Sequence, residues 1–516
     1  MTTVGVSGLR RAALRAGRIQ ASAGLAGAVM ACVALALALR LPWLEAPLGV
    51  DEGGVALVAQ GWLHGGDSLY GHYWLDRPPL LVALYKLALT LGPAGVRVLG
   101  AVAAAALVVL VALIARSVGG DRAARPAALL AGLAASSAAI QAVFTPAELL
   151  AIVPSAASVL ALVIAHRRGE SLAALAAAGA CAACAVLVKQ SFLDALLAGG
   201  AFLAVAALRR GQSGFRARWA LAYIAGAALP YAGVEIWERL ANLGDGAVST
   251  ALLGFRVEAL LALQGSARPL LDRISELALP ALGSGVALMV LWTARGLLGL
   301  REDRVLAATL GAWLAGGLAG VLAGGSYWPH YLIQLVPVTA VATGVALAKA
   351  PRRLVQTTLA ALLVLAIGGA GVSMALDPER SFQASERSVG VYVRDHAERG
   401  DTVQVLYARA NVVYFSGLRS PYPYQWSLML RARPGARERL QRLLTSGRRP
   451  TWLVRWQRDE AWGLDPDGAV KRLVGRRYRR VATVCGRPVY LRRDVTRAVA
   501  SDTPAASCTR AASLGL

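Results

Sequence analysis

The chain has 516 residues, of which 56% are hydrophobic and only 16% are charged, and its mean hydropathy is +0.53. Ordinary soluble domains are about 25% charged, so this composition excludes a soluble globular chain and indicates a polytopic membrane protein. A net charge of +24 would suggest nucleic-acid binding in a soluble protein. Here the basic residues stand between apolar runs, where they govern topology, and we expect no nucleic-acid partner.

The first apolar run, 21–39, follows a short basic segment that contains Arg10, Arg11, Arg15 and Arg18. A span needs about 20 apolar residues to cross the hydrocarbon core, and this run is long enough. We interpret it as an uncleaved first helix with a cytoplasmic N-terminus, although small residues near Leu37 also suit a cleaved signal peptide.

Further apolar runs recur along the chain and predict about eleven spans in total. They are 93–115, 127–144, 149–165, 171–188, 191–208, 219–237, 276–294, 305–323, 331–348 and 354–376. Alternate loops carry basic clusters: Arg116/Arg122/Arg125, Arg167/Arg168, Arg209/Arg210/Arg216/Arg218, Arg295/Arg301/Arg304 and Lys349/Arg352/Arg353. The positive-inside rule makes these loops cytoplasmic, and an odd number of spans then puts the loop 42–92 and the C-terminal region outside the cell.

Two external segments differ from the apolar runs. Residues 238–275 carry arginines among apolar residues and predict an amphipathic helix on the membrane surface. From Asp377 the sequence becomes mixed and polar, and its patterns alternate between helix and strand. We expect helices at 385–400 and 434–447, strands at 401–408 and 451–456, and a hairpin at 478–493.

The predicted fold class is therefore mainly α, a polytopic helical core with a C-terminal soluble α/β domain. We assign 1–376 to the membrane core and 377–497 to the external domain, and we expect a disordered tail at 498–516. Cys181 and Cys184 lie in an apolar run and act as small apolar residues. Cys485 and Cys508 lie on the oxidising side, where they could form a disulfide or stay reduced.

The loop after the first span is the most informative stretch. It reads VDEGGVALVAQGWLHGGDSLYGHYWLDRPPLL over 50–81 and is rich in charge and aromatic residues. Asp51 and Glu52 could simply solvate the helix end, or one of them could act as a general base on an acceptor hydroxyl at the water boundary. The pair could also hold a divalent cation. Arg77 precedes Pro78-Pro79, which fix the backbone and hold the guanidinium at headgroup level.

This order of features, D-E after the first span, then a Gly-rich aromatic segment and D-R-P-P-L, resembles the first external loop of GT-C glycosyltransferases. The resemblance is strongest to family-39-like bacterial proteins grouped with protein O-mannosyltransferases and the lipid A aminoarabinose transferase. It covers roughly residues 20–376. It implies an enzyme that takes a sugar from a polyprenyl-phosphate carrier.

The resemblance also implies roles for single residues. Asp51, Glu52 and Glu148 are the expected catalytic carboxylates, with Asp51 ranked first; relatives usually have Asp where this chain has Glu148. The expected donor-phosphate ligands are Arg77, Lys189, His330 and Tyr331, and the expected substrate-binding aromatics are Tyr73, Trp74 and Trp328. Trp328 and Tyr331 would equally suit an interfacial aromatic belt, and Asp194 is expected to be buried beside Lys189.

The implied reaction is inverting transfer of a hexosyl or pentosyl group to a lipid, protein or cell-envelope glycan hydroxyl. No nucleotide-binding or zincin motif occurs in the sequence, so the only cofactor considered is a divalent cation. Two other functions are alternatives to a glycosyltransferase. A transporter or lipid-linked sugar flippase would place its charges near the midplane, and a non-catalytic envelope assembly protein would not need the acidic pair.

Overall fold

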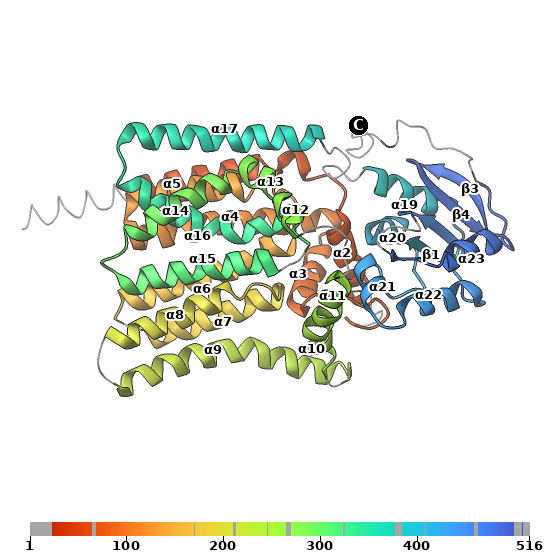
Figure 1. The fold of residues 1–516 in the computed structure, drawn as a ribbon, viewed down its shortest axis with the longest axis horizontal. Helices are drawn as coiled ribbons and strands as arrows, with labels where there is room; N and C mark the ends of the chain where they lie inside the picture. Colours follow the sequence, from red (N-terminus) through yellow and green to blue (C-terminus); the bar gives the residue numbers. More distant parts are fainter. Residues whose placement is uncertain are drawn as a thin grey trace, which may run out of the picture.

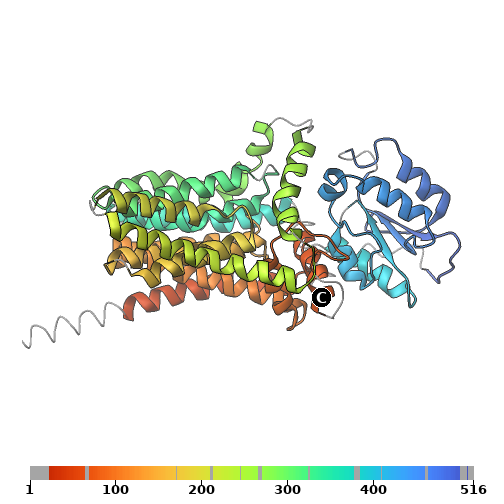
Figure 2. The ribbon, with the colours of Figure 1, turned by 90° about the horizontal axis from the view of Figure 1, so that it is seen from below.

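A computed structural model describes residues 23–63, 69–169, 171–209, 213–244, 246–264, 270–323, 326–376, 384–407, 409–458, 463–499 and 508. Its helical part is a bundle elongated along the longest axis, and the C-terminal α/β region stands at one end of that bundle (Figure 1). A view turned by 90° shows the same end-to-end arrangement (Figure 2).

Within the described residues, seven helices are long and apolar enough to cross a membrane: Ala23–Trp43, Pro93–Gly119, Ala147–Arg167, Ala217–Leu240, Arg304–Ala323, Pro329–Ala348 and Arg352–Val372. Shorter apolar helices cover Pro79–Leu89, Leu172–Val188, Asp194–Leu208 and Val286–Leu298. A helix therefore occupies each predicted span at least in part, and the chain has a multi-pass membrane architecture. The total of about eleven spans stays a prediction.

In element order, the helical part comprises the helix over 23–38, η1 (Leu41–Trp43), α2 (Val50–Leu63), α3 (Pro79–Leu89), α4 (Pro93–Gly119), α5 (Asp121–Ala134), α6 (Ala147–Arg167), α7 (Leu172–Val188), α8 (Asp194–Arg209) and α9 (Ser213–Leu240). It continues with α10 (Ala247–Ser249), η2 (Thr250–Gly254), α11 (Phe255–Gln264), α12 (Leu270–Ser275), α13 (Ala278–Gly283), α14 (Val286–Leu298), α15 (Arg304–Ala323), η3 (Pro329–Leu335), α16 (Val336–Ala348) and α17 (Arg352–Leu376).

The span expected at 127–144 is the clearest departure from the sequence-based prediction. Helix α5 ends at Ala134, and residues 135–144 form turns. The buried Arg40 guanidinium donates to the carbonyl oxygens of Ala135 (3.1 Å), Ala142 and Phe144 (2.8 Å). Buried carbonyl groups outside a helix need such partners, and hydropathy alone cannot reveal an arginine about 100 residues away that supplies them.

Two other predicted helices differ in extent from the structure. The run 276–294 forms α13 and α14, which are separated at Gly285, where φ is +77° and the left-handed backbone favours glycine. In the surface segment 238–275, α9 ends at Leu240, then α10, η2 and α11 follow one another without a break over 247–264, and α12 covers Leu270–Ser275. In Figure 2 these short helices stand between the bundle and the C-terminal region.

The α4–α5, α6–α7, α14–α15 and α16–α17 connections, which carry basic clusters, lie at the end of the bundle away from the C-terminal region (Figure 1). Asp303 accepts from His166 (3.0 Å) and pairs with Arg167 (4.0 Å), so the α6–α7 loop meets the loop before α15. Lys349 Nζ donates to the Gly299 carbonyl (2.7 Å), which joins the α16–α17 loop to the same group. The clustering agrees with alternate loops on one side, and the cytoplasmic placement of that side stays a prediction.

The C-terminal region contains α19 (Ala384–His396), α20 (Ala410–Ser416), α21 (Ser427–Ala432), α22 (Ala436–Thr445), α23 (Ala469–Arg477) and a four-stranded sheet. The strands β1 (Val403–Leu406), β2 (Trp452–Arg455), β3 (Tyr478–Val484) and β4 (Arg487–Arg492) have the order β1-β2-β4-β3, with only β1 and β2 parallel. This confirms the α/β prediction for the region. The sequence-based reading missed α20, α21 and α23, because runs this short carry little periodicity.

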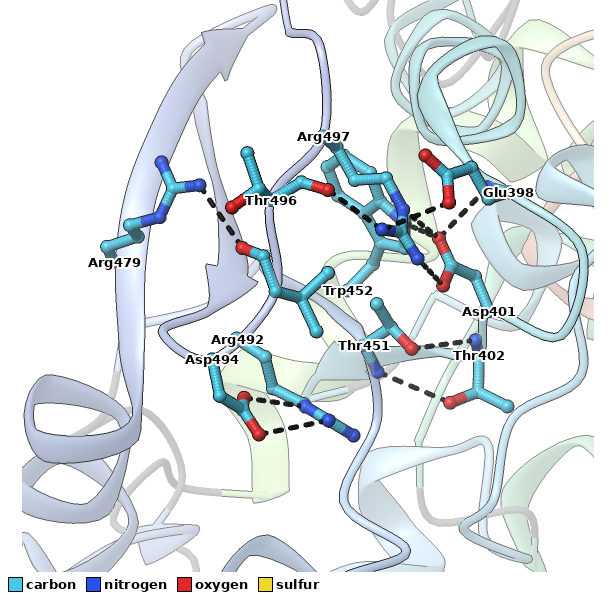
Figure 3. Close-up of polar contacts among 11 residues, drawn as sticks. Glu398, Asp401, Thr402, Thr451, Trp452, Arg479, Arg492, Asp494, Thr496 and Arg497 are labelled. Atoms are coloured by element: carbon cyan, nitrogen blue, oxygen red, sulfur yellow. Dashed lines mark hydrogen bonds and ion pairs between the residues drawn. The ribbon is translucent and has the colours of Figure 1, made fainter.

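A network of ion pairs and hydrogen bonds around Asp401 and Arg497 lies at the N-terminal ends of β1 and β2 (Figure 3). Asp401 accepts from Arg497 Nη2 (2.7 Å) and from the indole N–H of Trp452 (3.0 Å). Burial raises the pKa of Asp401, but the hydrogen bonds from Arg497, the Glu398 backbone and Trp452 outweigh it and hold the pKa below its ordinary value. Of the two states left open for the cysteines, the structure has the disulfide, Cys485–Cys508. Of the predicted tail, only 498, 499 and 508 lie among the described residues.

Candidate active site

The acidic pair at the start of α2 divides into two carboxylates with different surroundings. Asp51 is exposed, and its Oδ1 accepts a hydrogen bond from the indole N–H of Trp426 (3.1 Å), a residue of the C-terminal region. Among the described residues, no lysine or arginine forms an ion pair with Asp51. Its carboxylate is thus held in place and still accessible, as a general base must be.

Glu52 is buried, and both of its oxygens are engaged. Oε1 contacts the Arg97 guanidinium and accepts from the Thr145 backbone N–H (2.6 Å), while Oε2 accepts from the Gly49 N–H (2.7 Å). Arg97 also donates to the Pro47 carbonyl (2.8 Å). These contacts tie the start of α2 to α4 and to the loop before α6. They favour a structural role over the catalytic role expected from the sequence.

Within the described part of the chain, no residue contacts both the Asp51 and the Glu52 carboxylates. Among the described residues, no group of three or more His, Cys, Asp or Glu side chains is arranged to hold a metal ion. A divalent cation at Asp51 and Glu52 stays a prediction.

Arg77 lies at the start of α3 in a cluster of charges. Asp76 Oδ2 pairs with Arg77 Nη1 (2.7 Å) and with Arg256 Nη2 (3.0 Å) of α11. The Arg77 carbonyl accepts from Tyr70 (2.8 Å), and the Asp76 carbonyl accepts from Gln190 (2.9 Å). Burial lowers the pKa of Arg77, but the carboxylates of Asp76 and Asp51 outweigh it and leave the pKa above its ordinary value. The guanidinium is therefore a fixed, permanent cation.

Glu148, at the start of α6, joins two of the predicted phosphate ligands. Its Oε1 contacts Lys189 Nζ and lies 3.6 Å from His330 Nε2. His330 Nδ1 lies 2.8 Å from Gln141 Oε1, and Lys189 Nζ lies 4.9 Å above the Tyr331 ring. The structure thus brings Glu148, Lys189, His330 and Tyr331 together from three separate segments.

The two groups form one charged cluster. The Asp51 carboxylate acts electrostatically on both Arg77 and Lys189, and the Glu148 carboxylate also acts on Arg77. We call the set Asp51, Asp76, Arg77, Glu148, Lys189, Arg256 and His330 the site cluster. Within the cluster, Asp76 pairs with both arginines and Glu148 pairs with Lys189. Asp51 instead accepts a hydrogen bond from an indole N–H. A phosphate could replace carboxylate oxygens as the acceptor of these cationic donors, since charge-assisted hydrogen bonds suit either anion.

The predicted aromatic residues lie beside this cluster and on the C-terminal region. Tyr73 Oη accepts from the Ser420 backbone N–H (2.8 Å), and Trp74 packs on Phe255 (5.1 Å between centroids) under Arg433. These contacts give Tyr73 and Trp74 a part in holding the two regions together. Trp328 precedes η3 and is 46% exposed.

Several residues of the site could not be assigned from the sequence. Asp76 and Arg256 are the most important, because they pair with each other beside Arg77. The only sequence feature that pointed to Asp76 was its position next to Arg77 in D-R-P-P. Trp426 carried none, because its partner lies 375 residues away. The expectation for Asp194 was half right: it is fully buried, but its carboxylate accepts from Ser155 (3.2 Å) and Trp313 (3.1 Å).

Comparisons with known proteins place this geometry in a fold. No protein-family model matches the sequence, and no curated protein matches it significantly. The structure of ArnT from Cupriavidus metallidurans bound to undecaprenyl phosphate is similar, with 18% identity, a TM-score of 0.65, and coverage of 90% of this chain and 98% of that chain.

An archaeal oligosaccharyltransferase is similar over a smaller share of its length. The Archaeoglobus fulgidus enzyme tethered to an acceptor peptide aligns with 14% identity and a TM-score of 0.51, over 83% of this chain and 68% of that one. AglB from the same organism, in complex with an inhibitory peptide and a dolichol-phosphate, aligns with 12% identity and a TM-score of 0.52, over 84% of this chain and 69% of that one. The chain therefore has the fold of GT-C membrane glycosyltransferases, which confirms, at the level of the fold, the resemblance of its first loop.

Proposed function

We propose that the protein is an integral-membrane glycosyltransferase that moves one sugar from a polyprenyl-phosphate donor to a hydroxyl acceptor with inversion at the anomeric carbon. The observation that carries the proposal is the site cluster, in which the buried carboxylates of Asp76 and Glu148 hold Arg77, Arg256 and Lys189, while the Asp51 carboxylate stays accessible and acts electrostatically on Arg77 and Lys189. The fold shared with ArnT, whose structure holds undecaprenyl phosphate, supports a polyprenyl-phosphate donor.

In the proposed reaction, the acceptor oxygen attacks the anomeric carbon while the bond from that carbon to the phosphate oxygen breaks. The acceptor proton passes to Asp51, and polyprenyl phosphate leaves with the bonding electron pair. Arg77, Arg256 and Lys189 hold the phosphate and stabilise the charge that develops on it. The carrier phosphate is a good leaving group because it is already an anion of low basicity.

The contacts suggest separate roles for the three expected carboxylates. Asp51 is the general base, because it is exposed and forms no ion pair within the described part of the chain. Glu148 orients Lys189 and His330 toward the phosphate, since it is buried between them. Glu52 holds the framework through Arg97. Trp328 and Tyr331 contact the donor or the membrane interface beside it.

We further propose that the site and the C-terminal region face the outside of the plasma membrane and that the N-terminus is cytoplasmic. The basic loops at the opposite end of the bundle support this orientation. The same distribution argues against the transporter or flippase reading, because the site cluster lies at one end of the helices and not at their middle. The acceptor class, whether lipid, protein or cell-envelope glycan, is left to experiment.

The test is a transfer assay with the purified protein in lipid vesicles and a panel of polyprenyl-phosphate hexoses and pentoses. We expect one donor to release polyprenyl phosphate and to label an acceptor or water, and we expect the Asp51→Asn variant to bind this donor but to turn it over about 10²–10⁴-fold more slowly. Absence of release with every donor, at a protein level that still binds polyprenyl phosphate, would contradict the proposed function.

A further inference from the structure

We propose that Trp426, supplied by the C-terminal α/β region, is a positioning residue that aims the Asp51 carboxylate at the acceptor. The inference rests on the proposed function, because it assumes that Asp51 is the general base. It extends that function by making the C-terminal region part of the active site rather than an appendage to it.

The first observation is the contact itself. The indole N–H of Trp426 donates to Asp51 Oδ1 at 3.1 Å. Tryptophan offers a single N–H donor and no acceptor, so it fixes one carboxylate oxygen and leaves the other available to take a proton. Holding a catalytic group in its productive geometry contributes to rate, since a displacement of about 1 Å can cost a hundredfold.

The second observation explains the two glycines that follow the acidic pair in D-E-G-G. A Cβ added at Gly54 would lie 2.2 Å from Cζ2 of Trp426, and one added at Gly53 would lie 2.4 Å from Cβ of Asn411. Asn411 Nδ2 also donates to the Leu48 carbonyl (3.2 Å), just before α2. Gly53 and Gly54 thus form a flat surface on α2, which we call the glycine seat. The side chains of Asn411 and Trp426 from the C-terminal region pack on it, and this packing sets the position of the indole.

The third observation is the support behind the indole. Gln425, the preceding residue, is buried and donates to Ser420 Oγ (3.1 Å), and Ser420 Oγ donates to Gln404 of β1 (2.6 Å). On the other side, Arg433 pairs with Glu258 of α11 at 3.2 Å. The segment that carries Trp426 is therefore tied on one side to the sheet of the C-terminal region and on the other to α11, which supports a rigid position for the indole.

The experiment is a double-mutant cycle on turnover, measured in vesicles at matched protein levels. Trp426→Phe keeps an aromatic ring and removes the N–H donor. We expect turnover to fall about tenfold, the effect of losing one hydrogen bond to a charged group, while the donor KM stays within about twofold. In an Asp51→Asn background the same change should cost nothing further, because the positioned group is already gone. Trp456→Phe, a buried tryptophan of the same region that packs under Arg487, is the control.

Equal losses in both backgrounds would give Trp426 only a structural role and would overturn the proposal, as would an unchanged turnover of Trp426→Phe. The glycine seat gives an independent check. Gly54→Ala should lower turnover as Trp426→Phe does, whereas Gly61→Ala in the same helix, where an added Cβ meets nothing within 4 Å, should not. Normal turnover of Gly54→Ala would also overturn the proposal.

Failure of this inference is distinct from failure of the proposed function. If the wild-type protein transfers no sugar, or if Asp51→Asn turns over normally, the proposed function or its base assignment fails, and the role of Trp426 fails with it. If the wild type is active and Asp51→Asn retains only a slow residual turnover, additive losses count against Trp426 alone.

Discussion

Two groups of charges lie at the same end of the bundle, and they are built differently. In the framework group, Glu52 and Arg97 are both buried, and backbone groups add hydrogen bonds to the Glu52 carboxylate and to the terminal nitrogens of Arg97. In the site cluster, Asp76 is shared by Arg77 and Arg256, whose side chains are 21% and 37% exposed. The first group is enclosed, with both side chains out of reach of a ligand, whereas the second has partly exposed donors that can exchange one anion for another. Adjacent residues, Asp51 and Glu52, belong to opposite groups.

Asp51→Asn tests the site side of this comparison and should have the largest effect. The amide is nearly isosteric but cannot accept the proton, so turnover should fall by about 10²–10⁴-fold while thermal stability stays unchanged. Transfer in vesicles, with donor binding measured in parallel, is the readout. Glu45→Gln, an exposed carboxylate in the same loop, is the control. Normal turnover of Asp51→Asn would remove the base assignment and make Glu148 the next candidate.

Arg97→Met tests the framework side. It leaves the Glu52 carboxylate buried without its cation, and breaking a buried pair in this way costs about 3–5 kcal/mol. We expect a large drop in the midpoint of thermal unfolding in detergent. Arg116→Met, in the same helix α4 but in an ion pair that is 45% and 37% exposed, should change the midpoint little. Similar midpoints for both variants would mean that the two groups do not differ as described.

Arg77→Ala and Arg77→Lys ask how the site cluster holds its anion. A guanidinium offers a rigid fork of donors that an ammonium lacks, so Lys should restore only part of the donor affinity lost in Ala. We expect a loss of about 1.5–3 kcal/mol in binding free energy for Ala, measured by competition with polyprenyl phosphate. Arg448→Ala, an exposed arginine of the C-terminal region, is the control. Unchanged affinity in both Arg77 variants would exclude a phosphate role.

Loss of the Asp401–Arg497 pair should have the smallest effect on the free energy of unfolding. This pair belongs to the C-terminal region, and it provides a comparison with the buried Glu52–Arg97 pair. The pKa of Asp401 is lowered in the folded state, so its contribution to stability is present in full above the unfolded value of about 3.9 and is lost as the pH falls through the lower folded value. Asp401→Asn should cost about 1–2 kcal/mol at pH 7 and progressively less as the pH falls below about 3.9. Unfolding midpoints across this pH range would measure it, with Asp395→Asn, in an exposed pair, as control. A cost that does not depend on pH would contradict this account.

The sequence predicted the elements that follow from local pattern and missed the contacts that join distant ones. Hydropathy located the apolar helices, and the alternation of patterns located the strands of the C-terminal sheet. The order D-E, aromatics and D-R-P-P located the loop that carries Asp51 and Arg77, but their roles stay predictions. The end of α5 at Ala134 was missed because the carbonyl groups beyond it are held by Arg40, and the contact of Glu52 with Arg97 could not be predicted because the two residues lie 45 positions apart.

The distance in sequence between Asp51 and Trp426 also has a consequence for how the protein is made. Asp51 is among the first residues to reach the membrane, and Trp426 is synthesised only after α17, the last apolar helix of the bundle. The bundle can therefore be inserted in full while the seat at Gly53 and Gly54 is still empty. The contact forms only when the final region folds, so translation that stops after α17 yields a complete set of membrane helices without the indole partner of Asp51.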